Sequence, residues 1–471
     1  MSVTARIEQV LADIRKRDKA INAFVDLTEE RALAQALRVD RFLEAGRAPG
    51  KLAGVPFAVK NLFDVKGLPT LAGSKLNRER APAARDATLV TRLENAGAVL
   101  VGTLNMDEYA YGFSTENSHY GPTRNPHNLA HVAGGSSGGS AAAVGADLVP
   151  LTLGSDTNGS IRVPASFCGV WGLKPTYGRL SRAGTFPFVG SLDHVGPFAQ
   201  SVADLAAAYD AMQGTDPDDP VCRPPHSVET VSDRLDAGVE GLRIARAVGY
   251  FEDGAEPEVV ERVAQAAAAL GATRTVEIPE AAQGRAAAFV ITAAEGAQLH
   301  LANLRKRPGD FEPLIRDRLL VGALMPAGWY LQAQRIRRWY YRRVMPLFDR
   351  VDAILAPATP RPAQKIGQET FTVRGRTMLA RPNAGLLTQP ISCLGLPVVA
   401  APVGTVMEPD STGTPMPVGM QIIAAPWRED VCFRVARALE KLGAARFVVA
   451  PTTPSLRDTP PQAGGEGIRH A

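Results

Sequence analysis

The sequence has no long hydrophobic run. Among its 471 residues, no segment reaches the run of about 18 apolar residues that a membrane-spanning helix needs. Residues 1–24 contain Arg6, Arg15 and Arg17 among helix-forming residues and lack the apolar core of a signal peptide. These absences argue against a membrane helix and a secretion signal, and we expect a protein of the cytoplasm.

Cysteine and net charge are also scarce. The four cysteines show no C-x-x-C spacing, so we expect buried free thiols in a reducing compartment rather than disulfides. A net charge of +4 on 50.0 kDa is too small to indicate a nucleic-acid partner. Asp107 and Glu108 have no histidine at ligand spacing, so we expect no metal and no other cofactor. The expected partner is a small molecule.

Apolar and small residues are what the chain does have, with 45% hydrophobic residues and 44 glycines. Short apolar runs alternate with helical periodicity, which predicts an α/β fold with a mixed, mostly parallel sheet covered by helices on both faces. The predicted strands are 55–59, 98–102, 148–153, 242–248, 353–356, 398–401 and 418–423, and the predicted helices include 29–45, 140–146, 257–270, 329–348 and 430–442.

Three local features complete this organisation. Residues 1–50 are predicted to form an N-terminal helical segment, and residues 451–471, rich in proline, glycine and charge, a flexible tail. Asp86 is predicted to cap a helix that ends before Gly97.

Two serines in glycine-rich surroundings carry most of the functional information. Ser136 lies in the run Gly-Gly-Ser-Ser-Gly-Gly, and Ser160 ends the run Asp-Thr-Asn-Gly-Ser. A serine nucleophile needs a base and backbone N–H groups that face the oxyanion, and small neighbours let the substrate approach. Lys60 ends a predicted strand. The glycine run alone is also compatible with an anion-binding helix N-terminus or a structural turn, although it lacks the Gly-Lys-Ser/Thr ending of a P-loop.

Residues 154–176 read GSDTNGSIRVPASFCGVWGLKPT and closely resemble the amidase signature family. The similarity covers residues 52–202 and resumes over residues 389–425. The resemblance implies the amidase signature fold, with one catalytic domain over residues 51–450 and a variable, substrate-selecting segment over about 214–380.

The same resemblance implies a Ser-Ser-Lys triad that hydrolyses amides. Ser160 would be the nucleophile, Ser136 a proton relay preceded by a cis peptide bond, and Lys60 the base. A lysine must lose its proton to act as a base, so we expect burial to lower the pKa of Lys60. The expected oxyanion donors are the backbone amides of Thr157, Asn158, Gly159 and Ser160, and the expected supporting residues are Asp156, Arg162 and Gly135.

His194 offers an alternative interpretation. It follows Asp193 in a Ser-Leu-Asp-His segment and suggests a Ser-His-Asp triad. The family resemblance implies that this segment lies near the site without a catalytic histidine, and we favour that structural role.

The segment over residues 285–360 resembles a branch of the family that acts on a small carboxylated urea and releases ammonia. An anionic substrate needs a cation, and the candidates are Arg307, Arg318 and Arg335. The resemblance also implies a small helical accessory subunit in a hetero-oligomer. Three alternatives stay open: the glutaminase subunit of a glutamyl-tRNA(Gln) amidotransferase, another amidase of small amides, and a non-catalytic binding protein. The complete set of Lys60, Ser136 and Ser160 argues against the last.

Overall fold

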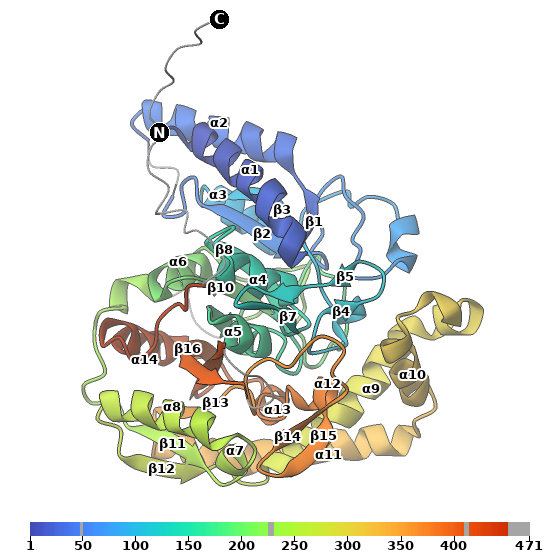
Figure 1. The fold of residues 1–471 in the computed structure, drawn as a ribbon, viewed down its shortest axis with the longest axis vertical. Coiled ribbons are helices and arrows are strands. Elements are labelled where there is room, and N and C mark those ends of the chain that lie inside the picture. Colours follow the sequence, from blue (N-terminus) through green and yellow to red (C-terminus); the bar gives the residue numbers. More distant parts are fainter. Residues whose placement is uncertain (48–49, 225–229, 409–413, 451–471) are drawn as a thin grey trace, which may run out of the picture.

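The computed structural model describes residues 1–47, 50–224, 230–408 and 414–450, and the predicted flexible tail lies outside them. In this part of the chain, eleven strands form one sheet that runs through the molecule (Figure 1). In spatial order they are β1 (Phe24–Leu27), β3 (Val99–Leu104), β2 (Pro56–Lys60), β8 (Leu151–Asp156), β10 (His194–Ala199), β9 (Trp171–Lys174), β16 (Val398–Met407), β17 (Pro415–Ala424), β13 (Ala353–Pro357), β11 (Ile244–Val248) and β12 (Arg274–Glu277).

The α/β class and the mixed sheet are confirmed, but the prediction of a mostly parallel sheet is wrong. Only β3, β2 and β8 at one end and β13, β11 and β12 at the other pair in parallel, while the six remaining pairs are antiparallel. Parallel neighbours need a crossover connection. β16 and β17 instead follow each other in the chain and pair directly, and β9 and β10 are joined by a segment without a helix.

Helices cover both faces of the sheet, as predicted. They are α1 (Val3–Ile21), α2 (Glu29–Glu44), α3 (Thr88–Asn95), α4 (Gly138–Gly145), α5 (Arg162–Cys168), α6 (Val202–Met212), α7 (Tyr250–Asp253), α8 (Pro257–Ala269), α9 (Ala281–Lys306), α10 (Pro313–Ala323), α11 (Ala327–Val344), α12 (Ala380–Asn383), α13 (Gln389–Leu394) and α14 (Glu429–Lys441). Within β2, Phe57 and Val59 belong to one hydrophobic cluster and Ala58 to another. Because side chains alternate along a strand, the two clusters lie on opposite faces.

Small strand pairs lie outside the main sheet. They are β4 (Glu116–Asn117) with β5 (Gly121–Pro122), β6 (Arg124–Asn125) with β7 (Asn128–Val132), and β14 (Thr370–Val373) with β15 (Arg376–Leu379). Among the described residues, no helix combines the length and apolar character needed to cross a bilayer. The four cysteines are buried and unpaired, as predicted.

The cap predicted at Asp86 is wrong. Ala87 occupies the N-cap position of α3 and provides no side-chain cap. The Asp86 carboxylate instead accepts two hydrogen bonds from Arg31 at 2.8 and 2.9 Å and one from the Lys66 amide. Arg31, which belongs to α2, therefore pairs with the carboxylate that the local sequence had assigned to the start of α3.

Candidate active site

Lys60 and the second serine loop meet at one edge of the sheet. β2 and β8 pair in parallel, with Val59 opposite Leu153, so both strands end at the same edge. Lys60 is the last residue of β2, and Asp156 is the last residue of β8. Carboxyl ends of parallel strands are where α/β proteins place their binding sites.

The Lys60 ammonium group contacts three serine hydroxyls. Its Nζ lies 2.7 Å from Ser136 Oγ, 3.0 Å from Ser137 Oγ and 2.9 Å from Ser155 Oγ. The pair of Lys60 and Ser136 was expected, whereas Ser137 and Ser155 were not. Ser137 follows Ser136 directly, and Ser155 lies near the end of β8. These positions could have suggested a contact with Lys60, but many serines without such a contact occupy similar positions.

Burial changes the acidity of Lys60. The side chain is fully buried, and this desolvation lowers its pKa to about 7, against the opposing attraction of Asp107, Asp156 and Asp193. A substantial fraction of Lys60 is therefore neutral near pH 7. The group can take up a proton from the neighbouring hydroxyl.

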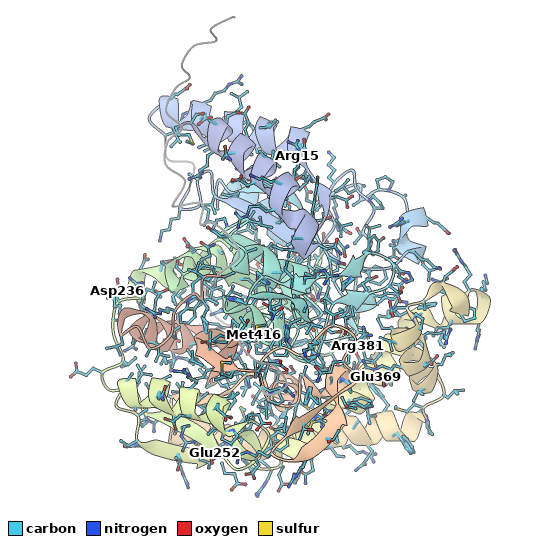
Figure 2. The ribbon with its side chains drawn as sticks, in the orientation of Figure 1. Arg15, Asp236, Glu252, Glu369, Arg381 and Met416 are labelled. Carbon is cyan, nitrogen blue, oxygen red and sulfur yellow. The ribbon has the colours of Figure 1, made fainter. Side chains whose placement is uncertain are left out.

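The segment before Ser136 is held by Asp107, a residue that the sequence singled out only as an unsuitable metal ligand. The peptide bond between Gly135 and Ser136 is cis, as expected. The Asp107 amide donates to Ser136 O at 3.2 Å, and its carboxylate pairs with Arg381 at 2.8 Å. Figure 2 places Arg381 on the side of the molecule that carries α9 and α10. A Cβ at Gly135 would lie 2.1 Å from Asp107 Oδ2, so this position requires glycine.

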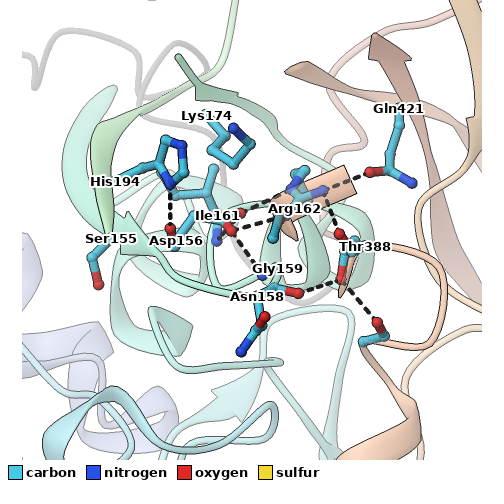
Figure 3. A network of polar contacts seen from close by, with 12 residues as sticks. Ser155, Asp156, Asn158, Gly159, Ile161, Arg162, Lys174, His194, Thr388 and Gln421 are labelled. Carbon is cyan, nitrogen blue, oxygen red and sulfur yellow. Dashed lines mark hydrogen bonds and ion pairs between the residues drawn. The ribbon is translucent and has the colours of Figure 1, made fainter. Parts of the chain in front are cut away.

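The loop that carries Ser160 is fixed by Thr388 (Figure 3). Thr388 Oγ1 donates to Asn158 O at 2.7 Å. A Cβ at Gly159 would lie 2.1 Å from Thr388 Oγ1. Gly159 also has a φ of 138°, which L side chains rarely adopt. Ser160 follows it and is 2% exposed. No hydrogen bond joins Ser160 to Ser136 in the part of the chain that the structure describes.

Asp156 and Arg162 form a buried ion pair under this loop (Figure 3). Arg162 donates to both carboxylate oxygens at 2.9 Å, and to Gln421 Oε1 at 2.8 Å and Thr388 O at 3.0 Å. Burial alone would raise the pKa of Asp156, but the charge and hydrogen bonds of Arg162 hold that pKa well below its usual value. The pair links the end of β8 to β17 and the start of α13.

The four backbone amides that were expected to face an oxyanion are not all free. The Gly159 amide donates to Asp156 Oδ1 at 2.7 Å, so it is not available to a substrate. The amides of Thr157, Asn158 and Ser160 have no acceptor among the described residues. The Asp156 carboxylate that shapes the loop is the physical reason for the difference.

His194 has a structural environment. Its Nδ1 lies 3.1 Å from Asp156 O (Figure 3). The same nitrogen lies 2.6 Å from Leu192 O. Burial holds the pKa of His194 well below its ordinary value, which keeps the ring neutral. The neighbouring Asp193 accepts a hydrogen bond from Thr157 Oγ1 at 2.6 Å and so supports the serine loop.

A small pocket opens beside Ser160. Its walls come from the loop after β3, the serine loop, the segment between β9 and β10, α9, α10 and α13. The lining residues are Ala110, Tyr111, Gly112, Phe113, Thr157, Asn158, Ser160, Phe188, Phe289, Thr292, Arg318 and Gln389. Among these residues Arg318 alone is charged. In the described residues, no group of three or more histidine, cysteine, aspartate or glutamate side chains is placed to hold a metal ion.

The three candidate arginines have different surroundings. Arg318 stacks on Tyr111, with its Cζ 3.8 Å from the ring centroid, and donates to Tyr111 O at 3.4 Å. Arg307 is 41% exposed and forms ion pairs with Glu79 and Asp310, outside the pocket lining. Arg335 is exposed and also absent from the lining. Of the three arginines, Arg318 is therefore the one that lines the pocket beside Ser160.

Known proteins resemble this chain over most of its length. A family model described as Amidase matches residues 5–433. The chain is 56% identical over 440 residues to AtzE, a subunit of the 1-carboxybiuret hydrolase of Pseudomonas sp. (strain ADP), covering 93% of this chain and 95% of that protein. It is 38% identical to a glutamyl-tRNA(Gln) amidotransferase subunit of Koribacter versatilis (strain Ellin345), covering 94% and 96%.

A solved structure shows the same similarity in three dimensions. It is described as an unexpected vestigial protein complex that reveals the evolutionary origins of an s-triazine catabolic enzyme. It matches with a TM-score of 0.93 and 55% identity, covering 95% of this chain and 97% of that chain.

Proposed function

Because this chain belongs to the amidase family of amide hydrolases, we propose that it hydrolyses a small carboxylated urea, 1-carboxybiuret, and releases ammonia. The closeness to a 1-carboxybiuret hydrolase subunit supports the substrate, and the pocket beside Ser160 supports a small anionic ligand.

The proposed chemistry begins with proton transfer. Neutral Lys60 accepts a proton from Ser136, and Ser136 takes the proton of Ser160 as Ser160 Oγ attacks the terminal carbamoyl carbon. The free amides of Thr157, Asn158 and Ser160 donate to the oxyanion. The C–N bond then breaks, the leaving nitrogen receives the proton and departs as ammonia, and water hydrolyses the acyl-Ser160 ester.

The observation that carries the substrate assignment is the position of Arg318. Its guanidinium group lies in the pocket wall, and the structure describes no carboxylate partner for it. Burial lowers the pKa of Arg318 and the nearby Arg381 adds to the shift, against the opposing contact with Tyr111 and the attraction of Asp107. A substrate carboxylate would supply the missing anion through charge-assisted hydrogen bonds.

A glutaminase activity is the second candidate, supported by the 38% identity to a subunit of an amidotransferase. Glutamine carries an ammonium group as well as a carboxylate, and a buried ammonium group needs an acidic partner. No lining residue that the structure describes is acidic. The pocket therefore favours the carboxylated urea, and a binding protein without activity would leave the Lys60 and Ser136 contact without a role.

We also propose a cytoplasmic location and a small accessory subunit. The solved relative is described as a protein complex, which supports a partner protein for this chain. The four buried thiols fit a reducing compartment. Expression with and without a co-expressed partner, followed by measurement of native mass, tests the assembly.

Ammonia release tests the proposed activity. We expect freshly prepared 1-carboxybiuret to be hydrolysed with a much higher kcat/KM than glutamine. Arg318→Met should raise KM for 1-carboxybiuret about 10-fold or more, because a charge-assisted hydrogen bond contributes about 1.5–3 kcal/mol. The matched control is Arg307→Met, which removes an exposed arginine outside the pocket.

Two results would contradict the proposal. Efficient glutamine hydrolysis with no turnover of 1-carboxybiuret would favour the glutaminase. An unchanged KM in Arg318→Met would remove Arg318 from substrate binding.

A further inference from the structure

A buried acceptor in the pocket wall has no hydrogen-bond partner. Asn158 is 6% exposed and lines the pocket beside Ser160. Its side-chain oxygen, Oδ1, is buried and has no partner among the described residues. An unpaired buried polar atom costs free energy, so its presence at a binding pocket points to a ligand that pairs with it.

Two contacts hold Asn158 in this orientation. Its Nδ2 donates to Thr292 Oγ1 on α9 at 2.7 Å, and its backbone oxygen accepts from Thr388 Oγ1 at 2.7 Å. Both the amide nitrogen of the side chain and the backbone are therefore fixed. Oδ1 is the remaining polar atom of this side chain and is available only as an acceptor.

We infer that Asn158 Oδ1 accepts a hydrogen bond from a substrate N–H, the one on the side of the scissile carbonyl that stays in the acyl group. This hydrogen bond selects ureas over carboxamides. The inference deepens the proposed function and rests on it for the identity of the site. Asn158 belongs to the loop that carries Ser160, and its own amide is one of the expected oxyanion donors. A side chain at this position therefore lies close to the atoms that flank the reacting carbon.

The chemistry of the two substrate classes differs at this atom. A urea carbonyl carries a nitrogen on each side. One nitrogen leaves as ammonia, and the other stays next to the carbonyl with its N–H. A carboxamide such as glutamine has a methylene group there. A methylene group cannot donate, and it would leave Oδ1 buried and unpaired.

Biuret and malonamide provide a direct test, because they differ only by N–H against CH₂ between the two carbamoyl groups. The dissociation constants of both compounds are measured by calorimetry with Ser160→Ala protein, so that turnover does not interfere. We expect biuret to bind more tightly than malonamide by about 5-fold to about 150-fold, the range expected for one unsatisfied buried polar group.

A second protein separates recognition from intrinsic differences between the ligands. In Ser160→Ala/Asn158→Ala the acceptor is gone, and the ratio of the two dissociation constants should fall to within about 3-fold. Thr292→Val in the same background should reduce the ratio, because Asn158 loses the partner of its Nδ2. Asn303→Ala is the matched control, since Asn303 is an exposed asparagine on α9.

The outcomes are distinct from those of the proposed function. Equal binding of biuret and malonamide by Ser160→Ala, or a ratio that Asn158→Ala leaves unchanged, would overturn the inference even if the wild-type protein hydrolyses 1-carboxybiuret. A large ratio that Asn158→Ala abolishes would support it even if 1-carboxybiuret is not hydrolysed, in which case another urea is the substrate. Thermal unfolding of each variant shows whether Asn158→Ala still folds, and if it does not, the Thr292→Val ratio decides the inference.

Discussion

At the scale of single residues, the environment of Lys60 governs the proposed chemistry. A lysine in water is almost fully charged at neutral pH and is a poor base. Complete burial lowers its pKa to about 7 here, while three serine hydroxyls accept from its Nζ. The hydroxyl groups supply hydrogen-bond partners for the amine without stabilising its charged form. A paired carboxylate, in contrast, would hold the lysine in its charged form.

The first prediction concerns pH. Below a pKa of about 7 Lys60 carries its proton and cannot accept another, and above it the neutral amine predominates. The rate of ammonia release should therefore rise as the pH passes through about 7 and then level off. Lys60→Arg should lose activity at every pH from 6 to 9, because an arginine keeps its proton. A flat wild-type profile over the same range would contradict the role of Lys60.

The second prediction concerns the buried pair of Asp156 and Arg162. Both side chains are fully buried, so Arg162→Met leaves an uncompensated carboxylate and should lower the free energy of unfolding by about 3–5 kcal/mol. Urea unfolding measures the change. Arg85→Met is the control, because Arg85 and its partner Asp218 are 71% and 49% exposed. Equal effects in the two variants would show that burial of the first pair is unimportant.

At the scale of elements, α9 and α10 supply the wall of the pocket that faces the serine loop. Thr292 and Phe289 come from α9 and Arg318 from α10. The two helices approach closely at Gly322, where a Cβ would lie 2.1 Å from Ala293 O. The position of Arg318 therefore depends on a glycine in the same helix.

The third prediction follows from this contact. Gly322→Ala forces α10 away from α9, and we expect a raised KM for 1-carboxybiuret together with a lower unfolding temperature. Gly328→Ala is the matched control, because a Cβ at Gly328 in α11 would meet nothing within 4 Å. Steady-state kinetics and thermal unfolding of both variants check the difference. Identical kinetics in the two variants would show that α10 does not position Arg318.

The elements were predicted best where the local pattern is strong. The apolar run before Lys60 and the periodic stretch over residues 257–270 correspond to β2 and α8. The 26 residues of α9 were read only as a substrate-selecting segment, because their hydrophobic residues do not form a clear stripe. The cap at Asp86 failed because Arg31, distant in sequence, competes for the carboxylate.

At the scale of the whole molecule, the sheet brings distant segments to one site. Lys60 ends β2, Ser160 follows β8, and Thr388 precedes α13. The order of the strands was not predicted, because pairing such as that of β9 with β16 joins residues more than 200 positions apart. The family resemblance over residues 154–176 was confirmed, and it identified candidate residues that local patterns alone left open.

The arginine that lines the pocket could not be predicted from the sequence alone. Arg307, Arg318 and Arg335 were equivalent candidates in the sequence, since each is a cation in the same segment. Only the packing of α10 against the loop after β3 brings Arg318 beside Tyr111 and into the lining. The unpaired side-chain oxygen of Asn158 could not be predicted either, because it also depends on tertiary packing. The residues that hold Asn158, Thr292 and Thr388, are 134 and 230 residues away in the sequence.

The central claim is that Ser160 attacks a carboxylated urea with the help of Ser136 and Lys60. The most direct test is ammonia release from 1-carboxybiuret by the wild-type protein and by Ser160→Ala, with circular dichroism to verify the fold. We predict rapid release by the wild type and a loss of at least about 1,000-fold in the variant, because removal of a nucleophile abolishes covalent catalysis. A folded Ser160→Ala protein that releases ammonia at the wild-type rate would contradict the account.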